Sequence, residues 1–573
     1  MSATKHKVST PAVSRPGNSL APWIVLGVLA LAVAGGAIWW GLDQSQRAAE
    51  KADPKNPALV QLLDETRALE KEFARLRDSV APTEEDLAPL QRAIENQREW
   101  MRTTANDSDE QKQRLQGLET LYDTLWLRGT VARAKTAEAA GRSALAEGRR
   151  ADGVAQLRTA LGLQRVLNQR EGAGRDLPKE TELAQEIERL EAEPLATELA
   201  AVTVEAGKLR DAQKTEEALA AYRNARELQY RLNREFERTQ FASLANLETI
   251  EREISTLESL PLFAEVLRLS AEAAERKANK QPKEAATLYL RALQTQQELN
   301  TRYAGSRHAS NERMDVLDVA LQTELSAEGA DRVDQLNREL TNKLRGRDLA
   351  KVPDLLLEGA RILDTLFNRV PRSRRLDPEL RLKFNYLYLH RDNLEPALKS
   401  LADQLVPVPD RDGRMLRTEV PQRLFELLMR GNPSRQVGPE LPVESVSVPD
   451  AMEFCRRLSW IMGRTVRLPK EEEYRAALGE VPAGKDLDAQ VWSQERSVQR
   501  TRPVGTGAAN SMGFCDLLGN VAEWLAPAAA GDQVVLVAGG SYADAEAALV
   551  KVPMEKRDWL ERSRTIGFRV VVE

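Results

Sequence analysis

The stretch Asn510-Ser-Met-Gly-Phe-Cys-Asp-Leu-Leu-Gly-Asn-Val-Ala-Glu-Trp524 decides the fold of the C-terminal part of this chain. It contains the spaced pattern N-x-x-G-x-x-D-x-x-G-N-V-x-E-W, and further short motifs accompany it in a fixed order. These are Thr418-Glu-Val420, Leu424-Phe-Glu426, Gly431-Asn-Pro-Ser-Arg435, Leu441-Pro-Val-Glu-Ser-Val-Ser447, Asp450-Ala-Met-Glu-Phe-Cys-Arg-Arg-Leu458, Arg467-Leu-Pro-Lys-Glu471, Pro503-Val-Gly505, Gly539-Gly-Ser541 and Ile566-Gly-Phe-Arg-Val570. Each motif alone is weak, but their shared order is hard to attribute to chance.

The ordered motifs resemble the signature of the formylglycine-generating enzyme family, also called the sulfatase-modifying-factor family. The resemblance covers residues 405–573, which is under a third of the chain. It implies an α+β domain with a C-type-lectin-like fold at the C-terminus. It also implies a set of catalytic and metal-binding positions that can be compared with this sequence.

The catalytic cysteine pair of the family is missing from this chain. The resemblance places the two family positions at Asp544 and Leu549, and the segment Ser541–Leu549 contains no thiol. A thiolate is both the nucleophile and the soft metal ligand that this oxidation needs, and a carboxylate cannot replace it. We therefore expect no catalytic residues and no bound copper, and catalysis is not expected although the family is enzymatic.

The remaining thiols and imidazoles do not suggest another active site. The two cysteines are Cys455, on an apolar helical stripe, and Cys515; sequence alone leaves open whether they form a disulfide. The three histidines, His6, His308 and His390, are far apart and show no metal-ligand spacing, so no iron is expected.

One cation site of the family has matching residues. Family members hold a calcium ion in the G-N-V loop, and the resemblance carries its ligands over to Asp516, Gly519, Val521 and Glu523. Carboxylates and backbone carbonyls suit calcium. The alternative is that Asp516 and Glu523 only cap turns or pair with Arg569. The sequence therefore leaves two interpretations open: the loop binds a structural calcium ion, or its carboxylates serve only as turn caps and ion-pair partners.

The N-terminus contains an uncharged apolar segment, residues 20–42, that is long enough to cross a bilayer. Lys5, Lys7 and Arg15 precede it, so the positive-inside rule places residues 1–19 in the cytoplasm. We expect a single-pass protein of the bacterial inner membrane with its C-terminal bulk in the periplasm. A cleavable signal peptide ending near Ala32-Val-Ala34 is the alternative.

The middle of the chain carries an internal repeat of about 66 residues. The pairs Leu167-Asn168, Leu232-Asn233, Leu299-Asn300 and Phe367-Asn368 recur at nearly constant spacing. An alanine stands eight residues before each asparagine, and a helix breaker stands 39 before it. The breakers are Gly129, Pro194, Pro261 and Gly329, and we expect helices to end there. Each copy resembles a tetratricopeptide-like helix pair, although a plain helical stalk without a binding groove is the alternative.

Composition agrees with a largely helical, multidomain protein. Aromatic residues make up only 5% of the 573 residues, charged residues 29%, and the net charge is -5, so no nucleic-acid partner is indicated. The expected fold class is one transmembrane helix, an all-α repeat region and a C-terminal α+β domain. The expected regions are a tail (1–19), a transmembrane helix (20–42), a helical or coiled-coil stalk (43–120), four repeats (121–370), a linker region (371–404) and the family domain (405–573).

These features predict a membrane-anchored periplasmic scaffold or binding protein with a catalytically inactive family domain. Its partner is expected to be an unidentified protein or glycan, with the membrane contacted through residues 20–42. The alternative is an oxidoreductase that acts on a protein cysteine, for which Cys515 is the candidate thiol.

Overall fold

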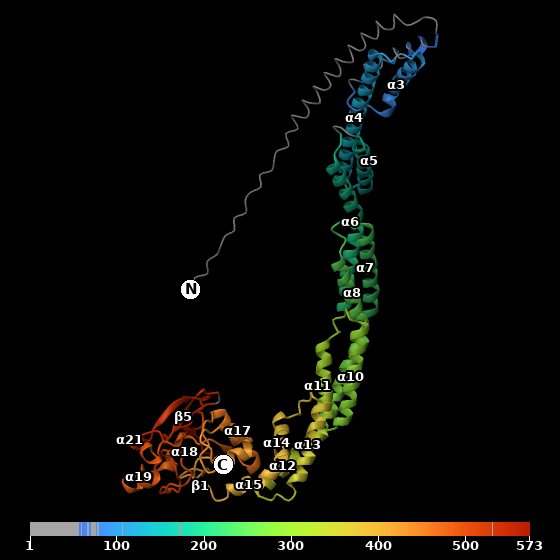
Figure 1. Ribbon diagram of the computed structural model, residues 1–573. Coiled ribbons are helices and arrows are strands. Elements are labelled where there is room, and N and C mark those ends of the chain that lie inside the picture. Colours follow the sequence, from blue (N-terminus) through green and yellow to red (C-terminus); the bar gives the residue numbers. More distant parts are fainter. Residues whose placement is uncertain are drawn as a thin grey trace. The chain divides into compact units, whose positions relative to one another are not determined.

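The computed structural model describes most of the chain after residue 56. The described residues are 57–58, 60–62, 64–65, 68–69, 76, 79–105, 107–170, 174–529 and 531–573. They form two compact units that meet in sequence between Glu258 and Ser259. The first unit is helical, and the second contains helices followed by the C-terminal α+β domain (Figure 1).

The predicted fold class is wrong in one respect. It included a transmembrane helix, but among the described residues no helix is both long enough and apolar enough to cross a bilayer. The predicted segment itself, residues 20–42, lies outside the described residues.

Both units contain a series of successive helices, and two of those in the first unit are much longer than the rest. Those of the first unit are α3 (Glu84–Thr104), α4 (Asp109–Ala146), α5 (Arg150–Asn168), α6 (Leu177–Asp211), α7 (Thr215–Glu235) and α8 (Leu244–Glu258). Those of the second are α9 (Leu260–Ala278), α10 (Pro282–Arg302), α11 (Asn311–Leu325), α12 (Ala327–Arg345), α13 (Val352–Arg369), α14 (Pro378–Leu389), the 3-10 helix η1 (Arg391–Asn393) and α15 (Leu394–Ser400).

Successive helices pack in threes around shared cores, and the helical region fits the predicted repeat. In the first unit α4, α5 and α6 share a core that includes Ala160 of the alanine series. In the second unit α9, α10 and α11 share one that includes the equivalent Ala292. The small alanines allow neighbouring helices to approach closely, which explains why they recur at a fixed position.

The interpretation of the breakers is wrong for the first two copies. Helix α4 continues through Gly129, and α6 continues through Pro194. A β-carbon at Gly129 would lie 2.1 Å from the carbonyl oxygen of Pro82, so this glycine permits close packing instead of ending the helix. In the later copies the helix is interrupted at Ser259, next to Pro261, and at Ser326, near Gly329.

The C-terminal domain consists of two small sheets and short helices. One sheet has the order β1 (Leu405–Pro407), β2 (Arg414–Leu416), β8 (Val571–Val572), β3 (Val466–Arg467), and the other β6 (Met554–Asp558), β5 (Val534–Ala538), β4 (Ala522–Trp524), β7 (Ile566–Gly567). The helices are α16 (Gln422–Met429), α17 (Val448–Met462), α18 (Glu471–Leu478), α19 (Lys485–Gln490), α20 (Gln494–Ser497) and α21 (Glu546–Leu549). All strand pairs are antiparallel except β4 with β7.

This domain and the last helices of the repeat region share one hydrophobic core, which runs from Val333 in α12 to Val572 in β8. At the contact, a β-carbon on Gly463 would lie 2.5 Å from the carbonyl oxygen of Thr341. Arg345 also donates to the Gly463 carbonyl oxygen at 3.2 Å. Residues 371–404, predicted as a linker region, contain α14, whose Phe384 is fully buried in the shared core.

Candidate functional site

The two family cysteine positions have structural roles in this chain. The Asp544 carboxylate accepts hydrogen bonds from the Ser541 amide at 2.8 Å and from the Ser541 hydroxyl at 3.0 Å, which closes a turn. Leu549 ends α21 and is fully buried in the core. A turn carboxylate and a core leucine therefore occupy the places where the family's oxidation chemistry requires thiols.

The two cysteines of the chain are free and buried. Burial raises the pKa of the Cys455 thiol far above its usual value. Burial also raises the pKa of Cys515, and the neighbouring Asp516 carboxylate adds to that rise. Because the thiolate is the reactive form, both environments oppose nucleophilic or metal-binding chemistry at these residues.

The described histidines take part in separate local contacts. His308 lies within 3.0 Å of the Ser259 hydroxyl through its Nδ1 and stacks on Phe263. His390 Nδ1 lies 2.8 Å from the Tyr386 carbonyl oxygen, and its ring stacks on that tyrosine. His6 lies outside the described residues. The two described histidines belong to different helical contacts and form no common site.

The G-N-V loop is built tightly against the segment around Trp492. Gly519 has a φ of 83°, and a β-carbon there would lie 2.3 Å from the Trp492 carbonyl oxygen, so only glycine fits. The Asn520 side chain clamps the backbone of Arg502, accepting from its amide at 2.9 Å and donating to its carbonyl oxygen at 3.2 Å. The loop leads directly into β4, which carries Glu523 in the protein interior.

Glu523 forms a fully buried, bidentate ion pair with Arg569. The Arg569 Nε and Nη2 atoms donate to the two carboxylate oxygens at 2.6 and 2.5 Å. Arg569 also donates to the carbonyl oxygens of Arg417 and Cys515, both at 3.1 Å. The Glu523 carboxylate raises the pKa of Arg569 despite its burial, so the guanidinium remains charged. This is the pairing that the sequence left open as the alternative to calcium.

Two further carboxyl groups lie close to this pair. Asp516 accepts a hydrogen bond from the Gly505 amide at 2.6 Å through Oδ2. Glu419 is fully buried, and its two oxygens accept from no donor among the described residues. Burial, followed by the charges of Asp516 and Glu523, raises the pKa of Glu419 well above its usual value. Burial also raises the pKa of Asp516, and the hydrogen bond from the Gly505 amide opposes that rise.

The surroundings of Glu419 indicate where the acidic cluster holds a proton. Burial and two neighbouring carboxylates disfavour the charged form of Glu419 and raise its pKa. We therefore infer that Glu419 is the protonated, neutral member of the cluster. Sequence reasoning missed Glu419, although it lies within the quoted Thr418-Glu-Val420 motif; nothing in that motif indicates that its side chain is buried.

The predicted calcium ligands fit the ion poorly in this arrangement. Asp516, Gly519 and Val521 lie on the loop and Glu523 on the strand β4 that follows it, but Arg569 engages both carboxylate oxygens of Glu523. Across the described part of the chain, no group of three or more His, Cys, Asp or Glu side chains is placed to hold a metal ion. Calcium at this loop stays a prediction, and we derive no function from it.

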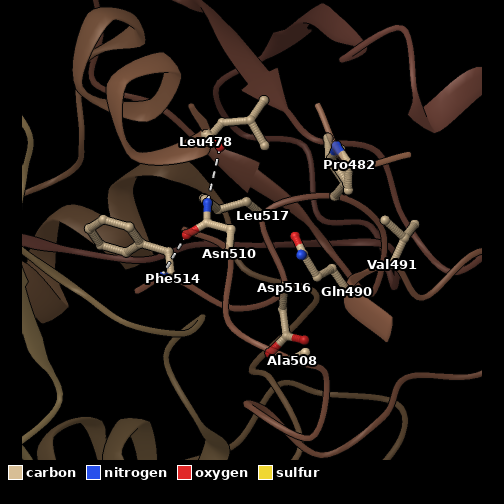
Figure 2. Close-up of a pocket in the computed structure, with 10 residues that line it drawn as sticks. Leu478, Pro482, Gln490, Val491, Ala508, Asn510, Phe514, Asp516 and Leu517 are labelled. Carbon is tan, nitrogen blue, oxygen red and sulfur yellow. Dashed lines mark hydrogen bonds between the residues drawn. The ribbon is translucent and has the colours of Figure 1, made fainter. Parts of the chain in front are cut away.

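A small cavity lies beside Asp516, and Figure 2 shows the residues around it. Its volume is about 10 Å³, which is enough for about one water molecule. Asn510 projects at its wall, but the side-chain amide is fully used: it donates to the carbonyl oxygens of Ala477 and Leu478 and accepts from the amides of Met512 and Phe514. The cavity is too small for a peptide or sugar ligand.

Comparison with known proteins agrees with this architecture. Residues 418–573 match the Sulfatase-modifying factor enzyme 1-like domain family. The C-terminal third of the chain is a sulfatase-modifying-factor domain. The match confirms the resemblance inferred from the ordered motifs.

Solved structures also match a similar share of the chain. Treponema denticola variable protein 1 is 22% identical with a TM-score of 0.26, and covers 30% of this chain and 91% of its own. CarF is 23% identical with a TM-score of 0.25, and the match covers 29% of this chain and 92% of CarF. PvdO from Pseudomonas aeruginosa is 18% identical with a TM-score of 0.26, and the match covers 30% of this chain and 90% of PvdO. No curated protein matches the chain.

Proposed function

We propose that this protein is a non-catalytic binding or scaffold protein, whose helical repeats carry a sulfatase-modifying-factor domain that binds a protein or glycan partner. The observation that carries the proposal is the use of the family cysteine positions for structure. Asp544 closes a turn and Leu549 fills the core, so neither position offers a thiol. The fold is retained without its known chemistry, and one fold commonly supports several functions.

The buried cysteines argue against the oxidoreductase alternative. An oxidising thiol must be accessible and must ionise at working pH, whereas Cys455 and Cys515 are 3% and 5% exposed and have raised pKa values.

The test is copper-dependent oxidation of a synthetic thiol peptide by the full chain under oxygen, followed by detection of the aldehyde product. We expect no turnover. An active member of the family serves as the positive control, and Cys515→Ser as the matched variant. Turnover by the wild-type chain that disappears in Cys515→Ser would overturn the proposal and restore the oxidoreductase interpretation.

A further inference from the structure

Two neighbouring loops of the C-terminal domain expose the same residue types in mirrored order. One contains Arg435-Gln436-Val437, and the other contains Val498-Gln499-Arg500. Gln436 joins the loops, because its side-chain oxygen accepts hydrogen bonds from the Thr501 amide at 3.1 Å and from the Thr501 hydroxyl at 3.2 Å. Residues far apart in sequence are thereby held side by side.

Both valines are exposed to an unusual degree. Val437 is 78% exposed and Val498 is 71% exposed, which places them among the most exposed large apolar side chains of the described residues. A single exposed apolar residue is common and needs no explanation, but these two lie one and three residues from the Gln436–Thr501 contact that joins the loops, and we call them the apolar patch. Arg435 and Arg500, both exposed, directly adjoin the bonded residues Gln436 and Thr501 in sequence.

The arginines around this patch lack acidic partners. Within the described residues, no carboxylate lies within ion-pair distance of Arg435, Arg500 or the adjacent Arg502. Arg502 instead lies over the ring of Trp492, with its guanidinium carbon 5.6 Å from the ring centroid. Nearby arginines behave differently: Arg423 pairs with Glu440 and Arg496 pairs with Glu546. The three guanidinium groups are therefore without a direct ion-pair partner within the described residues.

Contacts within the chain hold the backbone of both loops. The buried Glu444 carboxylate accepts hydrogen bonds from the amides of Arg435 and Gln436. On the other loop, Val498 and Gln499 have φ angles of 55° and 56°, a region that β-branched residues rarely adopt. Such strain is held by surrounding contacts, and here Ser497 provides one by donating to the Tyr542 carbonyl oxygen at 3.2 Å.

We propose that these residues, Arg435, Val437, Val498, Arg500 and Arg502, form a docking surface for an acidic segment of a partner protein; we call it the arginine–valine surface. Guanidinium groups bind carboxylates through paired, charge-assisted hydrogen bonds, and the valines bury an apolar side chain between them. Charge complementarity selects a carboxylate-bearing segment over a neutral glycan. The inference rests on the proposed binding function and names the chemistry of its partner.

The test uses fluorescence anisotropy with the full chain and a labelled synthetic peptide in which glutamates flank two leucines. We expect binding that weakens with added salt and is lost when glutamine replaces the glutamates. The double variant R435E/R500E should bind at least about tenfold more weakly. The control R411E/R464E makes the same charge change at two exposed arginines outside the surface and should leave the affinity unchanged. If the wild-type chain does not bind the peptide, or if both variants lose affinity equally, the proposed docking surface is wrong.

A second measurement separates this inference from the proposed function. A photo-crosslinking residue is placed at Val437 and, separately, at Val316, which is 58% exposed on α11. An acidic protein partner crosslinked at Val437 and competed by the glutamate peptide supports the surface. A partner crosslinked only at Val316 would overturn the surface while leaving the binding function in place.

Discussion

The helical repeats and the C-terminal domain are held in their folds by different kinds of contact. Each repeat closes its main hairpin with a left-handed residue, at Gly148, Gln213, Lys280 and Arg347. In each turn the following amide donates to the carbonyl oxygen five residues earlier, at 2.8–2.9 Å. The C-terminal domain instead depends on single long-range pairs such as Glu523 with Arg569. Short-range contacts that recur leave a periodic trace in sequence, and single long-range contacts do not.

In the first three repeats the asparagine makes the clearest short-range contact, a side-chain hydrogen bond to the backbone at the start of the next helix, which we call the repeat clamp. Asn168, Asn233 and Asn300 each accept a hydrogen bond from the backbone amide of the residue that directly precedes the next helix, at 2.7, 2.7 and 2.9 Å. A glutamine four residues earlier donates to each of these asparagines. The fourth copy has Asp364 in place of this glutamine, and Asn368 makes no such bond within the described region.

The largest effect is expected from breaking the buried pair of the C-terminal domain. Arg569→Met leaves Glu523 buried without its counter-charge, and removing one partner of such a pair costs about 3–5 kcal/mol of unfolding free energy. Guanidinium unfolding of the full chain, followed by tryptophan fluorescence, measures the change. Arg557→Met, which removes an exposed pair with Glu555, is the control and should cost under about 1 kcal/mol. Equal costs for the two variants would refute the special role of the buried pair.

A smaller effect is expected from removing one repeat clamp. Asn233→Ala leaves the Ser243 amide without its acceptor, which costs about 1–2 kcal/mol. Native-state hydrogen exchange should show faster exchange at Ser243 and in the first turn of α8. Asn368→Ala changes the same repeat position where the clamp is missing, so exchange there should stay near wild type. Similar acceleration in both variants would mean that the asparagines act through helix propensity instead.

The protonated Glu419 predicts a pH dependence of definite sign. Its folded-state pKa is raised above the usual value, so its contribution to stability is fully present below the unfolded pKa. That contribution is lost as the pH rises through the raised folded value. Between the unfolded pKa and the raised folded pKa of Glu419, the Tm of the full chain should therefore fall less steeply with rising pH in Glu419→Gln, because glutamine cannot ionise. Identical pH profiles would show that Glu419 is not the proton carrier.

The limits of the sequence interpretation follow the same division between short-range and long-range contacts. The repeat period was visible because the clamps and turns depend on residues a few positions apart. The helix ends at Gly129 and Pro194 were assigned wrongly because tertiary packing overrides the local preference of these residues. The domain was identified because its turn glycines keep their spacing. The burial of Glu419 was missed because a lone glutamate in a short motif resembles a surface residue.

The smallest expected effect concerns calcium and decides between the two interpretations of the G-N-V loop. A ligand that binds only the folded state stabilises it by mass action, by about 2.7 kcal/mol at a hundredfold excess over its dissociation constant. In this structure Arg569 already neutralises Glu523, and Asp516 accepts a hydrogen bond from the Gly505 amide. A divalent cation would have to displace the guanidinium from a site that also binds it through two carbonyl oxygens. We therefore expect the Tm of the full chain to be the same in millimolar calcium and in chelator. A calcium-dependent rise that disappears in Glu523→Gln would contradict this and establish Asp516, Gly519, Val521 and Glu523 as the ligand set.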